Sequence, residues 1–176
     1  RKFYFPGSDG LRPTSGKTRE TLFNWIQFDI AGKTVLDPFS GSGALSLEAI
    51  SRGAKKTFLI EKNNKVFKTL KSNLEVIEPT RYELINEDSL KYLQKIKHNA
   101  FDYIFLDPPF NQQLLPSILV LLFARNLINS SSKIYIESEF MLTEEFLNNI
   151  CGYECKIVKE KKSGNVYFCL ISLGVL

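Results

Sequence analysis

Residues 34–50 read Thr-Val-Leu-Asp-Pro-Phe-Ser-Gly-Ser-Gly-Ala-Leu-Ser-Leu-Glu-Ala-Ile, the strongest fold signal in the chain. The pattern predicts a short buried strand, a glycine-rich turn and a helix, the unit that binds nucleotide-like ligands at a strand's carboxyl end. The dinucleotide fingerprint fails, because Ser46 stands where a third glycine would be. The acidic residue, Asp37, precedes the glycines. The turn therefore suits a ligand with a cationic amino end, such as the methionine part of S-adenosylmethionine. The alternative is a glycine-rich turn with a capping aspartate.

The rest of the chain alternates strand-like and helix-like segments, which predicts an α/β fold with a mostly parallel sheet and helices on both faces. We expect strands over 34–37, 57–61, 82–86, 101–107, 133–137, 155–162 and 166–173. We expect helices over 18–28, 43–52, 64–76, 89–96, 114–127 and 143–150. The turn Ser163-Gly164-Asn165 suits a terminal antiparallel hairpin. Residues 1–17 would be an extended N-terminal segment, and 18–176 one domain.

Acidic residues end further predicted strands. Glu61 comes 18 residues after Gly43, the usual distance for a carboxylate that chelates ribose hydroxyls. Asp88 can accept a hydrogen bond from an adenine amino group. Taken alone, each is more often a helix N-terminal charge or a solvated loop residue. Together with Asp37 and Asp107 they predict one cleft along consecutive strand ends.

The tetrapeptide Asp107-Pro108-Pro109-Phe110 follows the apolar run 101–106. Its prolines fix φ and remove two backbone donors, so adjoining carbonyls can accept from a substrate. Asp107 adds a planar acceptor, and Phe110 offers a face on which a flat ring can stack. The combination suits the exocyclic amino group of a nucleobase, although a tight turn could also read this way.

These motifs resemble those of class I S-adenosylmethionine-dependent methyltransferases. More narrowly, the chain resembles the RsmD-type bacterial 16S rRNA (guanine-N2) methyltransferases, with a match that covers nearly its whole length. The closer match rests on five segments: 11–14, 19–25, 41–45, 48–49 and 51–54. The chain departs in reading Asp-Pro-Phe-Ser where Asp-Leu-Phe-Ala is common. It also begins at Arg1, so we expect the family's short basic N-terminal segment to have been trimmed.

The resemblance implies a Rossmann-like fold of seven strands with the last antiparallel, and methyl transfer to a guanine N2 of 16S rRNA at position 966. It implies these catalytic residues: Asp107, Pro108, Pro109 and Phe110. The implied cofactor-binding residues are Asp37, Phe39, Ser40, Gly41, Gly43, Glu61, Lys62, Asp88 and Ser89. Candidate substrate-binding residues are Arg12, Thr14 and Arg19, which otherwise belong to an ordinary helix start.

Two other functions remain open from sequence. One is an amino-methyltransferase acting on adenine in DNA or another RNA, since related Asp-Pro-Pro motifs occur there. The other is a non-catalytic RNA-binding factor of ribosome assembly. A nicotinamide oxidoreductase is disfavoured by Ser46. The partner expected from resemblance is 16S rRNA or an assembled small ribosomal subunit.

Composition sets further limits. The 176 residues suffice for one core, and 44% apolar residues argue against disorder. The net charge of +4 is uneven: residues 53–71 hold six lysines against Glu61, a patch that suits phosphates or simply a solvated face. No apolar run is long enough to span a bilayer. Three cysteines and one histidine disfavour both a disulfide framework and a metal site. We expect a cytoplasmic monomer without metal.

Overall fold

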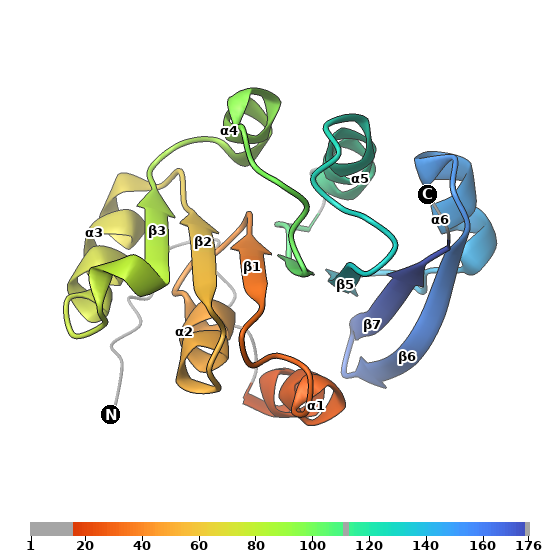
Figure 1. Cartoon of the computed structure of the whole chain (residues 1–176). Coiled ribbons are helices and arrows are strands. Elements are labelled where there is room, and N and C mark those ends of the chain that lie inside the picture. The colour runs from red at the N-terminus through yellow and green to blue at the C-terminus, as the bar shows by residue number, and fades with distance from the viewer. Residues whose placement is uncertain (1–15, 111–112, 175–176) are drawn as a thin grey trace. The chain divides into compact units, whose positions relative to one another are not determined.

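A computed structural model of the protein describes residues 16–110 and 113–174. These residues form seven strands, six α-helices and one short 3-10 helix (Figure 1). They divide into two compact units, one up to Ser89 and one from Leu90 onward. The predicted substrate residues Arg12 and Thr14 lie outside the described residues. That residues 18–176 form one domain stays a prediction.

The first unit carries the glycine-rich turn on a parallel three-stranded arrangement. Strand β2 pairs with β1 on one side and with β3 on the other, both in parallel. The elements are α1 (Gly16–Ile26), β1 (Thr34–Asp37), α2 (Ala44–Ser51), β2 (Lys56–Ile60), α3 (Asn64–Leu74), η1 (Pro79–Arg81) and β3 (Tyr82–Ile85). The carboxyl ends of all three strands therefore lie at one edge of this unit.

The second unit begins within α4 (Ser89–Lys95), whose first residue alone belongs to the first unit. Its elements are β4 (Tyr103–Leu106), α5 (Leu114–Ala124), β5 (Lys133–Ser138), α6 (Glu144–Cys151), β6 (Cys155–Ser163) and β7 (Val166–Leu173). Strands β4 and β5 are parallel, whereas β7 lies between β5 and β6 and is antiparallel to both. The terminal hairpin predicted from Ser163-Gly164-Asn165 is confirmed.

The strands are stabilised by burial of their apolar side chains. Residues 103–106 of β4 are fully covered, as expected of a parallel strand covered on both faces. In the first unit, α2, β2 and α3 share a cluster of Leu47, Ile50, Leu59, Leu70 and Leu74. In the second unit, edge-to-face rings join Phe105 to Tyr135 and Tyr135 to Phe168, across β4, β5 and β7. Each unit thus has apolar packing of its own.

Helix boundaries differ modestly from expectation. The first helix spans Gly16–Ile26, earlier than the predicted 18–28, and Phe28 beyond its end is 96% exposed. The fifth helix ends at Ala124, three residues early, and Asn126 takes a left-handed conformation just beyond it. No helix in the described part of the chain is long and apolar enough to cross a membrane.

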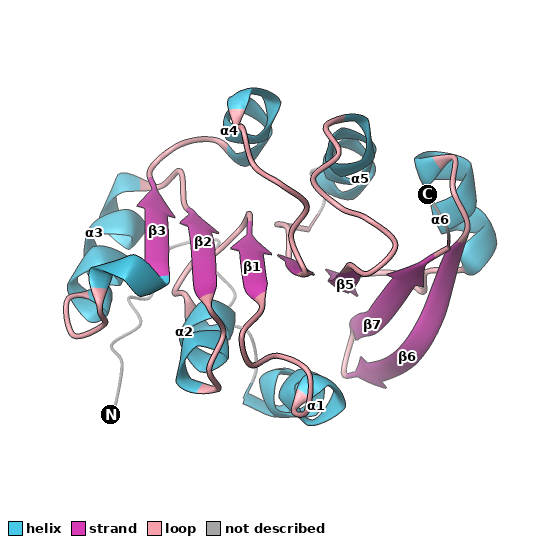
Figure 2. Ribbon diagram, in the orientation of Figure 1, coloured by secondary structure: helices cyan, strands magenta, loops and turns pink. Residues whose placement is uncertain are grey.

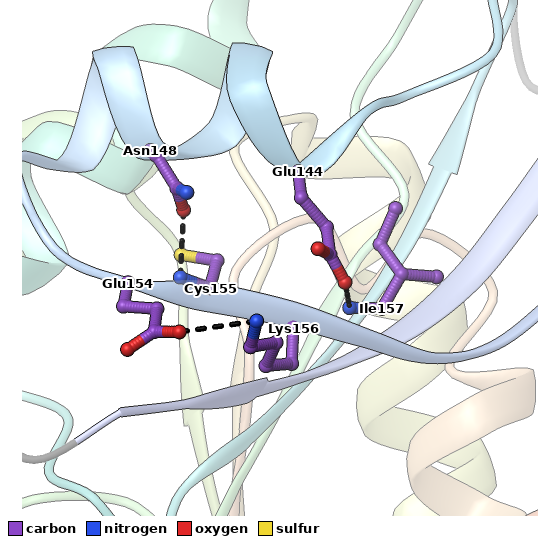
Figure 3. Close-up of polar contacts among 6 residues, drawn as sticks. All are labelled: Glu144, Asn148, Glu154, Cys155, Lys156 and Ile157. Carbon is purple, nitrogen blue, oxygen red and sulfur yellow. Dashed lines mark hydrogen bonds and ion pairs between the residues drawn. The ribbon is translucent and has the colours of Figure 1, made fainter.

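Polar contacts fix α6 against β6 (Figure 3). The side chain of Asn148 accepts from the Cys155 backbone N–H at 2.7 Å, and Glu144 accepts from that of Ile157 at 2.9 Å. A register shift between Ile157 and Lys159 follows, so that Val158 has no cross-strand partner on β7. Such a bulge bends a strand and increases its twist.

Candidate functional site

The glycine-rich turn after β1 is shaped by two left-handed glycines. Gly41 has a φ of 51° and Gly43 a φ of 79°, conformations that cost other residues energy. A Cβ on Gly43 would also lie 2.5 Å from Leu70 Cδ1 of α3. The Gly43 N–H donates to the Ser40 carbonyl at 2.7 Å, and α2 begins directly afterwards. Glycine is thus required at position 43, where the loop that joins β1 to α2 contacts Leu70 of α3. Figure 2 shows this connection between β1 and α2 as a loop.

Asp37, the last residue of β1, is a buried carboxylate. It is 2% exposed, and Ser46 Oγ donates to its Oδ2 at 2.6 Å. Burial raises the pKa of Asp37 from 3.8 to about 7; the Ser46 hydrogen bond lowers it, and the charge of Glu61 raises it. A cationic group placed beside Asp37 would favour its charged form. The site therefore fits a ligand with an ammonium group.

Glu61, just after β2, is held by the backbone. Its Oε2 accepts from the Gly41 N–H and its Oε1 from the Asn63 N–H, both at 2.9 Å. A carboxylate offers about four acceptor positions. Both oxygens keep capacity to accept from the hydroxyls of a ribose, while the two backbone donors fix their orientation. The side-chain amide of Asn86 supports this corner by donating to the Glu61 carbonyl at 2.9 Å.

Two of the predicted cofactor residues make internal bonds in this structure. Ser40 donates to the Ile60 carbonyl twice, from its N–H at 3.0 Å and from its hydroxyl at 2.9 Å. The Ser89 hydroxyl donates to the Pro38 carbonyl. Both serines are buried and tie the turn to its neighbours: Ser40 to the end of β2, Ser89 to the start of α4. Their side chains therefore shape the site through the backbone.

The remaining predicted residues of this unit are more exposed. Phe39 and Asp88 are half-buried, and Lys62 is exposed. Asp88 directly precedes α4, at the same edge as Asp37 and Glu61. Arg19 lies half-buried on α1. The first unit thus brings Asp37, Glu61 and Asp88 to the ends of consecutive strands, as the sequence predicts.

In the second unit, Asp107–Phe110 follows β4 directly. Asp107 and Phe110 are half-buried, Pro108 is buried and Pro109 is exposed. A half-buried carboxylate and a half-buried ring in one short segment are the groups that could bind a flat polar ligand. The negative charge of Asp107 is also felt by Tyr135 on β5, whose pKa it helps to raise.

Tyr135 and Glu137 form a buried pair that sequence reasoning did not identify. The Tyr135 hydroxyl donates to Glu137 Oε1 at 2.6 Å, and both side chains are at most 1% exposed. Burial, then the charge and hydrogen bond of Glu137, raise the pKa of Tyr135 well above its usual range. The sequence signal that could have located this pair is the spacing of Tyr135 and Glu137, because residues two apart on a strand lie on the same face.

Ser46 and Asn63 were also missed as site residues. Ser46 was interpreted only as a departure from a glycine pattern. It lies in the first turn of α2, and its hydroxyl donates to Asp37. Asn63 caps α3, accepting from the Val66 N–H at 3.1 Å, while its own N–H holds Glu61. An asparagine before a predicted helix is a usual capping signal, which could have located this contact.

The expectations on metal ligands, cysteines and the lysine patch concern residues outside the two acidic strand ends. Within residues 16–110 and 113–174, no group of three or more His, Cys, Asp or Glu side chains could hold a metal ion. Cys151, Cys155 and Cys169 are free and buried. Most of the predicted lysine patch is exposed on or near α3, and Lys56 pairs with Glu83 at 3.4 Å.

The chain is similar to a protein family and to several named proteins. The family described as "Conserved hypothetical protein 95" matches residues 1–172. The chain belongs to this family. Ribosomal RNA small subunit methyltransferase D of Haemophilus influenzae is 38% identical over 97% of this chain and 87% of its own length. The protein of that name from Buchnera aphidicola is 41% identical over 79% of this chain and 73% of its own.

A solved structure agrees with the fold. The yhhF protein of Escherichia coli has a TM-score of 0.84 and 34% identity, covering all of this chain and 93% of its own. Together with seven strands of which β7 is antiparallel to its neighbours, this confirms the predicted Rossmann-like methyltransferase fold. The protein is a methyltransferase, because its relatives of 38% and 41% identity carry that name.

Proposed function

We propose that this protein transfers a methyl group from S-adenosylmethionine to the exocyclic N2 of a guanine in 16S rRNA, position 966 by family resemblance. The name shared by the Haemophilus and Buchnera relatives supports the ribosomal substrate. The carrying observation is the first unit's pair of acids: a buried Asp37 and a backbone-held Glu61 at neighbouring strand ends. We propose a cytoplasmic monomer, acting where ribosomes assemble.

Asp37 and Glu61 would bind opposite ends of the cofactor. The Asp37 carboxylate, at a strand's carboxyl end next to the turn, suits the ammonium group of the methionine part. Glu61 suits the ribose hydroxyls, because its two oxygens are already oriented by Gly41 and Asn63. Asp88 would accept from the adenine amino group, and Phe39 and Lys62 would be further contacts of the cofactor. When bound, the cofactor supplies an activated methyl on a sulfonium.

Asp107–Phe110 would hold the target base. An exocyclic amine is a weak nucleophile, because its lone pair is delocalised into the ring. Hydrogen bonds from its N–H groups to Asp107 and to the Pro108 carbonyl would favour tetrahedral geometry and stabilise developing positive charge. Phe110 would stack on the base, which must be splayed from its loop to reach the site.

The choice of guanine rests on donor pattern and family. Guanine presents two adjacent donors, N1–H and N2–H, which one carboxylate can accept together. Adenine presents a donor beside an acceptor, which an asparagine amide would match better. Asp107 therefore favours guanine.

The test is methylation of small-subunit particles from a strain that lacks the enzyme, followed by mapping of the modified base. We expect N2-methylguanosine at one 16S position. Loss of N6-methyladenosine in a deletion strain, with N2-methylguanosine intact, would instead identify an adenine enzyme. RNA binding without transfer of a labelled methyl would identify an assembly factor.

A further inference from the structure

The second unit gathers four strand termini at the edge where Asp107 lies. Strands β4 and β5 are parallel, and β7 is antiparallel to both β5 and β6. Strand β6 therefore runs in the same direction as β4 and β5. Its carboxyl end and the start of β7 therefore lie at the edge that follows Leu106 and Ser138, because Ser138 pairs with Tyr167 and Ser163 with Val166. The terminal hairpin is thus at the catalytic edge of this unit.

The registers also assign faces. Glu137 pairs with Phe168, which pairs with Lys161; Tyr135 pairs with Leu170, which pairs with Lys159. Paired residues on adjacent strands share a face of the sheet. Lys159 and Lys161 therefore lie on the face of the Tyr135–Glu137 pair. Asp107 is level with Glu137, because the preceding residues Leu106 and Ile136 are partners. Three strand spacings, about 14 Å, separate that level of β4 from Lys161.

The charges on β6 are distributed unequally along the strand. At its amino end, Lys156 Nζ pairs with Glu154 Oε1 at 3.0 Å (Figure 3). Toward its carboxyl end, Lys159, Lys161 and Lys162 are exposed, and no ion pair involves them among the residues that the structure describes. Glu160 pairs with Cys169 across the sheet and so faces away from Lys159 and Lys161. Glu160 shares its face with Lys162, so it is the charge of Lys159 and Lys161 that has no acidic neighbour on β6.

An aromatic ring accompanies these lysines. Tyr167, the second residue of β7, is half-buried, and Lys162 Nζ lies 4.9 Å from its ring centre. Alternating cations and a half-exposed ring are the two elements with which proteins hold single-stranded nucleic acid: the cations bind phosphates and the ring stacks on a base.

We propose that Lys159, Lys161, Lys162 and Tyr167, here called the hairpin surface, bind the single-stranded RNA that flanks the target base. The inference rests on the proposed function, because it needs an RNA substrate at Asp107. Lys159 and Lys161 contact phosphates on the face of the Asp107 row, and Lys162 with Tyr167 holds a neighbouring nucleotide on the other. The hairpin surface therefore fixes where the RNA strand leaves the catalytic edge.

Lysines on an edge strand have another established role. They keep an exposed strand from pairing with a second chain. Edge protection needs only charged side chains on the strand. If it were their sole role, replacing Lys159 and Lys161 would not change RNA binding. The two roles are separable by experiment, because Lys156 is another exposed lysine of the same strand, at its far end.

The experiment compares a Lys159→Ala, Lys161→Ala double variant with a matched Lys156→Ala control. Methylation of small-subunit particles is measured at graded salt. We expect a roughly tenfold or larger rise in KM for particles, with kcat and cofactor affinity unchanged. The slope of log(kcat/KM) against log salt should become shallower by about 1.4, since each single-strand phosphate contact contributes about 0.7. The control should match the wild type.

Binding of a labelled single-stranded fragment of 16S rRNA, measured without cofactor, tests the surface independently of turnover. Equal affinity and equal salt slope for the double variant and the control would overturn the proposal, and self-association of the double variant alone would then identify edge protection. Tyr167→Leu should weaken binding, and Tyr167→Phe should restore it. A wild type that binds RNA at this surface but does not methylate particles would defeat the proposed function only.

Discussion

The two units use carboxylates in different ways. In the first, Asp37 and Glu61 are each oriented by donors close to the glycine-rich turn: Ser46, Gly41 and Asn63. In the second, Asp107 is followed by two prolines, which contribute no backbone donors. The carboxylate that is oriented by a hydrogen bond in this unit is Glu137, which accepts from the hydroxyl of Tyr135, two residues earlier on β5.

The difference indicates two kinds of binding. A site whose acids are fixed by the backbone suits one invariant ligand, such as a cofactor. An edge that combines a half-buried acid, exposed lysines and a half-exposed ring suits a large substrate that approaches from solvent. Substitutions in one unit, compared with substitutions in the other, test this division between cofactor binding and substrate binding.

The largest expected effect is on transfer by Asp107→Ala. Loss of this acceptor should lower the methyl-transfer rate about 100- to 1,000-fold, the scale seen when one transition-state hydrogen bond is removed. Single-turnover transfer to small-subunit particles measures it. Asp107→Asn should recover less than a tenth of the lost rate, because an amide cannot accept both guanine donors. Full activity in either variant would remove Asp107 from catalysis.

Gly43→Ala should destabilise the first unit. The left-handed φ costs about 1–2 kcal/mol, and a Cβ 2.5 Å from Leu70 Cδ1 adds repacking to that. Gly152→Ala is the matched control, since Gly152 has a similar φ of 70° with nothing within 4 Å of its Cβ. Urea unfolding of both variants separates the two terms. Equal losses would mean that the approach to α3 is unimportant.

Tyr135→Phe should cost about 1–3 kcal/mol of unfolding free energy, because it removes the donor to a buried carboxylate. Tyr153→Phe, at a 45% exposed tyrosine, is the control and should be near neutral. Thermal melts compare the two. A neutral Tyr135→Phe would show that Glu137 has sufficient other donors.

The smallest expected effect is on pH dependence. The pKa of Asp37 is raised to about 7, so its protonated form is favoured in the folded, unliganded protein. Its contribution to stability is full below its usual 3.8 and is lost as pH rises through about 7. Binding of a cationic ligand instead requires the charged form.

Cofactor affinity should therefore rise several-fold between about pH 6 and about pH 7.5, where an α-amino group remains largely charged. Calorimetric titration measures this, and Asp37→Asn should bind weakly at both values without the trend. A wild-type affinity that is flat across this range would contradict the proposed contact of Asp37 with an ammonium group.

Much of the fold could be predicted from local signals. The strand, turn and helix around Asp37 follow from apolar spacing and glycines, and the terminal hairpin from Ser163-Gly164-Asn165. The place of β7 between β5 and β6 could not, because it depends on pairing between distant segments. For the same reason, the hydrogen bond from the Ser89 hydroxyl to the Pro38 carbonyl could not be predicted. The contact of Glu61 with Gly41 depends on the pairing of β1 with β2, whereas the contacts of Asp37 with Ser46 and of Glu61 with Asn63 are local.

Titration of S-adenosylmethionine into Asp37→Ala and Asp107→Ala, side by side with the wild type, tests the division between the units most directly. The account predicts that Asp37→Ala loses most of its cofactor affinity, whereas Asp107→Ala binds cofactor nearly as the wild type does and fails only in transfer. Equal loss of cofactor binding in both variants would contradict it.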